Sequence, residues 1–115
     1  FATAYSNRGN VYDALGKTNQ AIKDFDIAIQ FDPQHADAYL GRGTAYFNLG
    51  NFNQAIKNYD RAIEINPKFA MAYSNRATAH AKLGNHKQSL ADVKIAARLG
   101  YKEAQDFLRR NQIPW

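Results

Sequence analysis

The sequence predicts an all-α protein built from tandem antiparallel helix pairs, and three observations carry this prediction. A segment of 34 residues recurs in phase: residues 36–69 match residues 2–35 at 17 of 34 positions, and residues 70–103 follow more loosely. Within each copy, apolar residues recur at steps of three and four, which is the spacing of one face of an α-helix. Glycines and Asx-Pro pairs divide each of the first two copies into two such stretches. A fixed period of this length indicates a repeat architecture.

The first copy is expected to hold two helices. The first covers about residues 4–15 and ends at Gly16, because glycine readily adopts the left-handed conformation that follows a helix C-terminus. Asn19 is the expected N-cap of the second helix. That helix should end at Asp32-Pro33, because proline disfavours the helical conformation in the residue before it. Neither helix can bury its apolar stripe alone, so the two are expected to pack as an antiparallel pair.

The second copy repeats this plan and the third drifts from it. A helix is expected over about residues 36–49 and another over 54–65, with Asn53 as the N-cap and Asn66-Pro67 as the stop. In the third copy, His80 stands where the first two have tyrosine, and Tyr101 replaces the proline. Terminal repeats are expected to be atypical, because their outer face meets water.

One more helix is expected after the third copy, at residues 102–111. Ala104, Phe107 and Leu108 would cover the last helix pair, with the cationic side chains of this segment facing solvent. The final residues, 113–115, could fold back against the helices, and the sequence leaves this open.

Small residues in the helix interiors predict close helix crossings. Gly9, Gly43 and Ala77 occupy equivalent places in the three copies. Glycine in a helix interior costs about 1 kcal/mol relative to alanine, which makes sense where a neighbouring helix crosses too closely to admit a side chain. The small residues expected at the matching contact are Ala28, Ala62 and Ala96. The interleaved aromatic residues are interpreted as core.

Composition and charge narrow the function classes. The chain has no cysteine, so it has no disulfide framework and no thiolate chemistry. No apolar run approaches the roughly 20 residues that span a bilayer, and no targeting motif is visible. Residues 1–66 carry six basic and seven acidic side chains, whereas residues 67–115 carry nine and three. This asymmetry favours an acidic partner at the C-terminal end. The chain opens without Met inside a repeat, which indicates a fragment, and for its compartment the cytoplasm is only a guess.

These residues resemble the tetratricopeptide repeat family. The family pattern is an aromatic residue, then Leu-Gly and Tyr, then Ala-x3-Phe, then Pro. The second copy meets it with Tyr39, Arg42, Gly43, Tyr46, Ala55, Tyr59 and Pro67. The first copy meets it with Tyr5, Arg8, Gly9, Tyr12, Ala21, Phe25 and Pro33, and the third keeps Tyr73, Arg76, Ala77 and Ala96. The resemblance divides the chain into repeats at 2–35, 36–69 and 70–101, the last divergent, and a capping helix with tail at 102–115.

The resemblance implies a right-handed superhelix in which the first helix of each pair lines a concave groove. Family members use such grooves to hold extended or helical peptides of partner proteins, as adaptors and scaffolds that need no cofactor. Arginine replaces the usual leucine in all three copies, and its head group is expected to seek a carboxylate while its stem packs. Asp24 and Asp92 are the expected partners in the first and third copies. The second has Asn58 at that position, so Asp60 is the candidate there.

The face expected to line the groove is polar, with short side chains and little charge. We expect the binding residues to be Asn7, Asn10, Leu40, Thr44, Phe47, Asn75, Thr78 and Lys82. Asparagine can donate and accept at once, which suits a peptide backbone. Leu40 and Phe47 would add apolar contact, and Lys82 would favour an acidic residue at one end.

Two groove types known in the family can be compared with these residues. Co-chaperones that bind the C-terminal carboxylate of heat-shock chaperones use lysine, arginine and asparagine at positions that correspond here to Ser6, Asn10, Gly41, Met71 and Asn75. Only Asn10 fits and every cation is missing, which argues against that partner. The O-GlcNAc transferase repeats carry a ladder of asparagines that holds substrate backbone. Asn7 and Asn75 match that ladder, and Gly41 interrupts it.

Catalysis and metal binding are not expected. His35, His80 and His86 lack the spacing, or the nearby carboxylate pair, of a zinc site or a general base. Gly41-Arg42-Gly43 lies inside a helix and does not follow a strand, as a nucleotide loop would.

Two alternatives to peptide binding stay open. The basic residues of the C-terminal half could bind RNA or another polyanion, although most lie on second helices and the tail rather than along one stripe. The apolar edge of the first helix pair could also stack on another copy of the chain.

Overall fold

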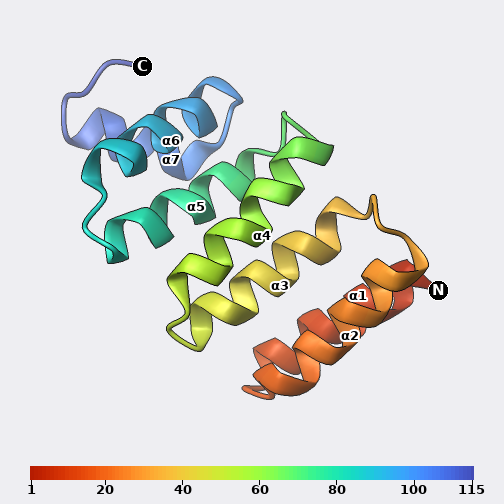
Figure 1. Cartoon of the computed structure of the whole chain (residues 1–115). Coiled ribbons are helices and arrows are strands. Elements are labelled where there is room, and N and C mark those ends of the chain that lie inside the picture. The colour runs from red at the N-terminus through yellow and green to blue at the C-terminus, as the bar shows by residue number, and fades with distance from the viewer.

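The computed structural model describes all 115 residues as seven α-helices joined by short turns, without a strand. In chain order they are α1 (Ala2–Ala14), α2 (Thr18–Phe31), α3 (Ala36–Asn48), α4 (Phe52–Ile65), α5 (Ala70–Lys82), α6 (His86–Arg98) and α7 (Lys102–Arg110). The first six form three antiparallel pairs stacked side by side, and α7 packs on α6 (Figure 1). The stack measures 43 × 25 × 21 Å, with the two termini at opposite ends. The prediction of an all-α helical-repeat solenoid is confirmed. None of the helices combines the length and apolarity needed to cross a bilayer.

Glycine ends the first helix of each pair, as the sequence predicts. Gly16, Gly50 and Gly84 have φ values of 79°, 78° and 79°, in the left-handed region that glycine adopts without strain. The expected N-caps were wrong, because α2 and α4 begin one residue before Asn19 and Asn53. After Gly16, the Lys17 N–H donates to the Tyr12 carbonyl at 2.8 Å, and the Lys17 carbonyl accepts from Ala21 at 3.0 Å. The turn therefore closes within one residue of the glycine, which leaves no space for a separate capping residue.

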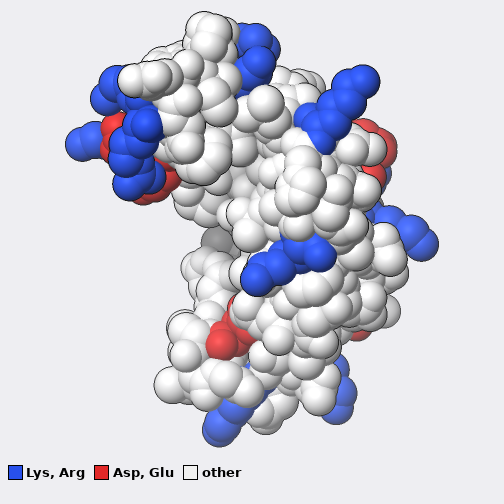
Figure 2. Space-filling view, turned by 90° about the vertical axis from the view of Figure 1, so that its left-hand side faces the viewer, with Lys and Arg blue, Asp and Glu red and all other residues white.

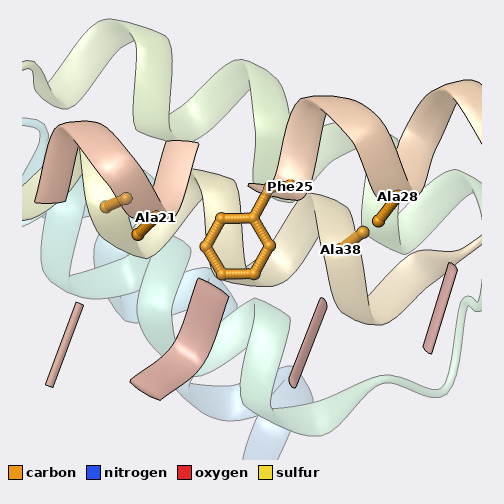
Figure 3. Close-up of a cluster of buried hydrophobic side chains, with 5 residues drawn as sticks. Ala21, Phe25, Ala28 and Ala38 are labelled. Carbon is orange, nitrogen blue, oxygen red and sulfur yellow. The ribbon is translucent and has the colours of Figure 1, made fainter. Parts of the chain in front are cut away.

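A single aromatic ring fills the space between the first two helix pairs. Phe25 of α2 is completely buried, together with Ala21, Ala28 and Ala38 (Figure 3). A Cβ atom added at Gly9 of α1 would lie 2.9 Å from the Phe25 ring, and one added at Gly41 of α3 would lie 2.4 Å from it. Both distances are too short for real side chains, so these two glycines are the notches that admit the ring. The close crossing predicted at Gly9 is confirmed.

The second pair repeats the notch with Tyr59. A Cβ atom at Gly43 would lie 2.7 Å from the Tyr59 ring. The expectation that alanines such as Ala28 and Ala62 form the matching contact is therefore corrected: both are buried, but the atoms that approach the glycines most closely belong to the aromatic rings. A glycine in a helix makes space for a bulky neighbour here, not for a small one.

Arginines connect the helix pairs through a series of ion pairs. Arg8 donates from Nε and Nη2 to the two carboxylate oxygens of Asp24, at 2.8 and 2.9 Å. Arg76 makes the same bidentate pair with Asp92, at 2.8 and 2.7 Å, and also donates to Asp60 of the preceding pair at 2.8 Å. Both expected carboxylate partners are confirmed. The hydrogen bond and charge of Asp24 raise the pKa of Arg8, and the hydrogen bond to Asp92 raises that of Arg76 against the opposing effect of burial.

The middle arginine departs from the expected pairing. Arg42 donates to Asn58 Oδ1 at 2.7 Å and to Asp26 of the preceding helix pair at 2.9 Å, instead of to Asp60. Successive residues of a helix are rotated by about 100° about its axis. Asp60 lies two positions after Asn58, so its side chain points roughly 200° away from that of Asn58. It thus faces α5 and is available to Arg76. Each of these carboxylates serves the arginine of the following repeat.

The C-terminal segment covers the last pair, with one exception to the prediction. Ala104 and Leu108 of α7 are buried, whereas Phe107, which was expected to be buried with them, is 43% exposed. Phe107 precedes Leu108 by one position on the helix and therefore points about 100° away from the buried face. Ile113 packs against the same cluster, and Arg98 donates to the carbonyl of Trp115 at 2.7 Å. The tail therefore does fold back.

Candidate functional site

The first helices of the pairs line a concave surface on one side of the molecule. Figure 2 shows the molecule hollowed along that side, with most of the wall white and therefore uncharged. A depression of about 330 Å³ on this side is lined by residues of α1, α3 and α5 and by His35, which precedes α3. It is bordered by Thr3, Ser6, Asn7, Asn10, Asp13, His35, Asp37, Leu40, Gly41, Thr44, Met71 and Asn75. We refer to this depression as the groove.

A smaller depression of about 200 Å³ continues the groove toward the third pair. It is bordered by Thr44, Phe47, Asn48, Tyr59, Asn75 and Thr78. Thr44 and Asn75 border both depressions, so the two form one continuous surface. The solenoid geometry explains why: equivalent positions on parallel first helices recur every 34 residues and face the same side.

Seven of the eight residues expected in the groove border one or both of these depressions. They are Asn7, Asn10, Leu40, Thr44, Phe47, Asn75 and Thr78. Lys82, the eighth, is the exposed last residue of α5 and borders neither depression. The reason lies in its position at the end of its helix, beyond the turn that carries Thr78.

The groove amides differ in how far they are already engaged. Asn7 and Asn10 are exposed, and their side chains make no hydrogen bond within the chain. Asn75 is half-buried and donates to Thr44 Oγ1 at the long distance of 3.5 Å. A separation of this size is a weak hydrogen bond. The amide groups of all three therefore retain donors and acceptors for a ligand.

Tyr59 supplies a groove wall that the sequence assigned only to the core. Its ring is buried, but its hydroxyl lies 3.1 Å from Thr44 Oγ1 and borders the smaller depression. Burial raises the pKa of the Tyr59 phenol above its ordinary value, the negative charge of Asp13 raises it further, and the hydrogen bond with Thr44 opposes both. The phenol consequently stays neutral at physiological pH and can donate a hydrogen bond.

Two buried polar atoms without a hydrogen-bond partner belong to residues of this surface. Three buried side-chain polar atoms have no hydrogen-bond partner in the chain: Ser6 Oγ, His35 Nε2 and His80 Nδ1. Two of these three, on Ser6 and His35, belong to residues that border the groove. His35 was not expected at the groove, because it precedes α3 and does not lie on the helix face.

The basic residues of the C-terminal half gather elsewhere. Lys87, Lys94 and Arg98 border a shallow depression on the outer side of α6, with Leu90 and Ile95 between them. No lysine or arginine borders the groove. Charged side chains are dense at the C-terminal end of the molecule, at the top of Figure 2.

The first helix pair presents an exposed apolar edge. Phe1 and Phe31 are 92% and 59% exposed, and Phe31 stacks on Tyr5 with ring centroids 6.0 Å apart. Arg8, at this edge, pairs only with Asp24, whereas Arg42 and Arg76 each also reach the preceding pair. The edge therefore lacks the inter-pair ion pair found at the other two interfaces.

Comparison with known protein families gives three matches that together span residues 9–91. They are models described as Tetratricopeptide repeat for residues 36–69, TPR repeat for residues 9–50 and Tetratricopeptide repeat for residues 58–91. A comparison with curated protein sequences gives no match.

Several solved structures share the fold over nearly the whole chain. The first TPR of Spaghetti (RPAP3), bound to the HSP90 peptide SRMEEVD, is 28% identical with a TM-score of 0.89, and the match covers 95% of this chain and 90% of that one. The Arabidopsis OM64 TPR domain is 28% identical with a TM-score of 0.85, covering 96% and 95%. MamA is 29% identical with a TM-score of 0.81, covering 90% and 61%.

Proposed function

Because this chain belongs to the tetratricopeptide repeat family, we propose that it is a non-catalytic protein-interaction module that holds an extended segment of a partner protein in its groove. The observation that carries this proposal is the continuous polar surface along α1, α3 and α5, on which the side chains of Asn7 and Asn10 make no hydrogen bond and that of Asn75 makes only a long one. Asn7, Asn10 and Asn75 would bind the backbone of the segment, since each presents donors and acceptors. Leu40 and Phe47 would contact its apolar side chains.

The similar structure that holds the peptide SRMEEVD supports an extended ligand in such a groove. The same comparison does not extend to the acidic character of that peptide. A carboxylate-rich ligand needs cations, and no lysine or arginine borders the groove of this chain. We therefore keep the proposal that the chaperone C-terminal carboxylate is not the partner.

A double substitution tests the groove directly. We expect Asn7→Ala together with Asn75→Ala to weaken binding by about thirtyfold, since each lost amide contact is worth about 1 kcal/mol. The ligand is the tightest peptide selected by the unmodified chain from a phage-displayed library of random twelve-residue sequences, measured by fluorescence anisotropy. Thermal unfolding should be nearly unchanged, because the side chain of Asn7 makes no hydrogen bond and that of Asn75 makes only a long one.

A matched control uses two asparagines that lie outside both depressions. Asn19→Ala with Asn53→Ala, on the second helices, should leave the affinity unchanged. If the groove double variant binds the selected peptide as tightly as the control does, the groove is not the binding surface.

A further inference from the structure

Most carboxylates of this chain are paired with a cationic side chain, and two of the three exceptions border the groove. Of ten acidic residues, six pair with an arginine within 4 Å and Asp32 faces His35. The three without a cationic partner are Asp13, Asp37 and Glu103. Asp13 and Asp37 both border the groove. The groove therefore carries two uncompensated negative charges and no lysine or arginine.

The position of Asp13 on its helix adds to the negative electrostatic potential of its carboxylate. It lies in the last turn of α1, where the helix dipole is negative and disfavours a carboxylate. Its two oxygens accept hydrogen bonds from neutral donors only: Thr18 Oγ1 at 3.2 Å and Asn48 Nδ2 at 2.9 Å. These contacts hold the carboxylate in one orientation without neutralising it.

The second carboxylate lies at the opposite end of the groove. Asp37 is in the first turn of α3, and by the 34-residue period it corresponds to Thr3 of α1. Asp13 lies ten residues further along than Thr3, which is about 15 Å along a helix axis. Neighbouring helix axes add roughly 9 Å sideways, so the two carboxylates are on the order of 17 Å apart. An extended chain crosses that distance in about five residues.

A buried polar group between these ends also lacks a partner. Ser6 is only 2% exposed, its hydroxyl oxygen has no hydrogen-bond partner in the chain, and it borders the groove. Buried polar groups are normally satisfied. This observation is independent of the charges, and it marks the floor of the groove between the two carboxylates as a place where a ligand group would complete the hydrogen bonding.

We propose that the groove selects an extended protein segment carrying two cationic residues about five positions apart, which pair with Asp13 and Asp37. This inference rests on the proposed function and names the class of partner. The segment would be bound through its backbone by the groove asparagines and positioned by its lysines or arginines. Acidic segments would be rejected, because like charges placed together repel.

The test compares selections from one random twelve-residue phage library on three forms of the protein. These are the unmodified chain, the double variant Asp13→Asn with Asp37→Asn, and Glu103→Gln, which removes the third unpaired carboxylate outside the groove. We expect the unmodified chain and Glu103→Gln to enrich peptides with two lysines or arginines four to six positions apart. The double variant should lose this preference.

The affinity of the best synthetic peptide then gives the size of the effect. Two partly exposed charge pairs predict a loss of about tenfold in the double variant, and a similar loss when both cations of the peptide become glutamine. Glu103→Gln should bind as the unmodified chain does. Thermal unfolding of each variant checks that the fold is retained.

The outcomes separate this inference from the proposed function. Selected peptides that need Asn7 and Asn75 but show no excess of cations would overturn the charge preference and leave the groove in place. An equal affinity of the double variant and the unmodified chain for the cationic peptide would do the same. Selected peptides that bind independently of Asn7 and Asn75 would overturn both.

Discussion

Replacing Phe25 by alanine is expected to lower the free energy of unfolding by about 4 kcal/mol, the range found for a buried phenylalanine. The ring is completely buried between α1 and α3. Gly9 and Gly41 face the ring and have no side chains that could fill the space that it leaves. Denaturant unfolding monitored by circular dichroism measures the change.

Substitutions of the two glycines that face the Phe25 ring test the same packing in a second way. Gly41→Ala should destabilise by about 1–3 kcal/mol through overpacking, although alanine is the better helix former. Gly9→Ala should cost less, because its Cβ would lie 2.9 Å from the ring instead of 2.4 Å. Adding Phe25→Leu to Gly41→Ala should recover part of the loss. A Gly41→Ala variant more stable than the unmodified chain would contradict the packing described here.

Replacing Arg76 by methionine is expected to destabilise the chain by about 3 kcal/mol, because it leaves a buried carboxylate without its cation. Asp92 is only 4% exposed and receives two hydrogen bonds from Arg76. Arg76 also connects the second pair to the third through Asp60. The loss corresponds to a fall of roughly 10–20 °C in Tm, measurable by thermal unfolding.

Two further variants assign this loss to the buried charge. Arg61→Met removes an exposed ion pair with Glu64 and should cost no more than about 0.5 kcal/mol. Combining Arg76→Met with Asp92→Asn should recover part of the stability, because the uncompensated charge is then gone. A double variant less stable than Arg76→Met alone would show that the carboxylate is not the source of the loss.

The repeat period made most of the fold predictable from the sequence. The helix ends at Gly16 and Asp32 follow from local backbone preferences, which act within a few residues. The N-caps at Asn19 and Asn53 were wrong, because the turn closes through backbone hydrogen bonds that residue type does not reveal. The role of Gly41 was also missed, since it depends on where the ring of a residue sixteen positions earlier comes to lie.

The sequence was sufficient to predict which residues border the groove, but not which of its charges are unpaired. The helical period identifies which residues share the inner face, and seven of the expected eight border the two depressions. The sequence could not tell which carboxylates are paired. Asp26 and Asp60 are neutralised by arginines of the following repeat, whereas Asp13 and Asp37 have no such partner. That difference depends on contacts between repeats.

A titration of the 15N-labelled chain with the selected peptide, followed by NMR, tests the central claim most directly. If the concave surface holds the segment, amide shifts should change along the inner faces of α1, α3 and α5, with the largest changes near Asn7, Thr44 and Asn75. Changes confined to the basic side of α6 or to the Phe1–Phe31 edge would contradict the account.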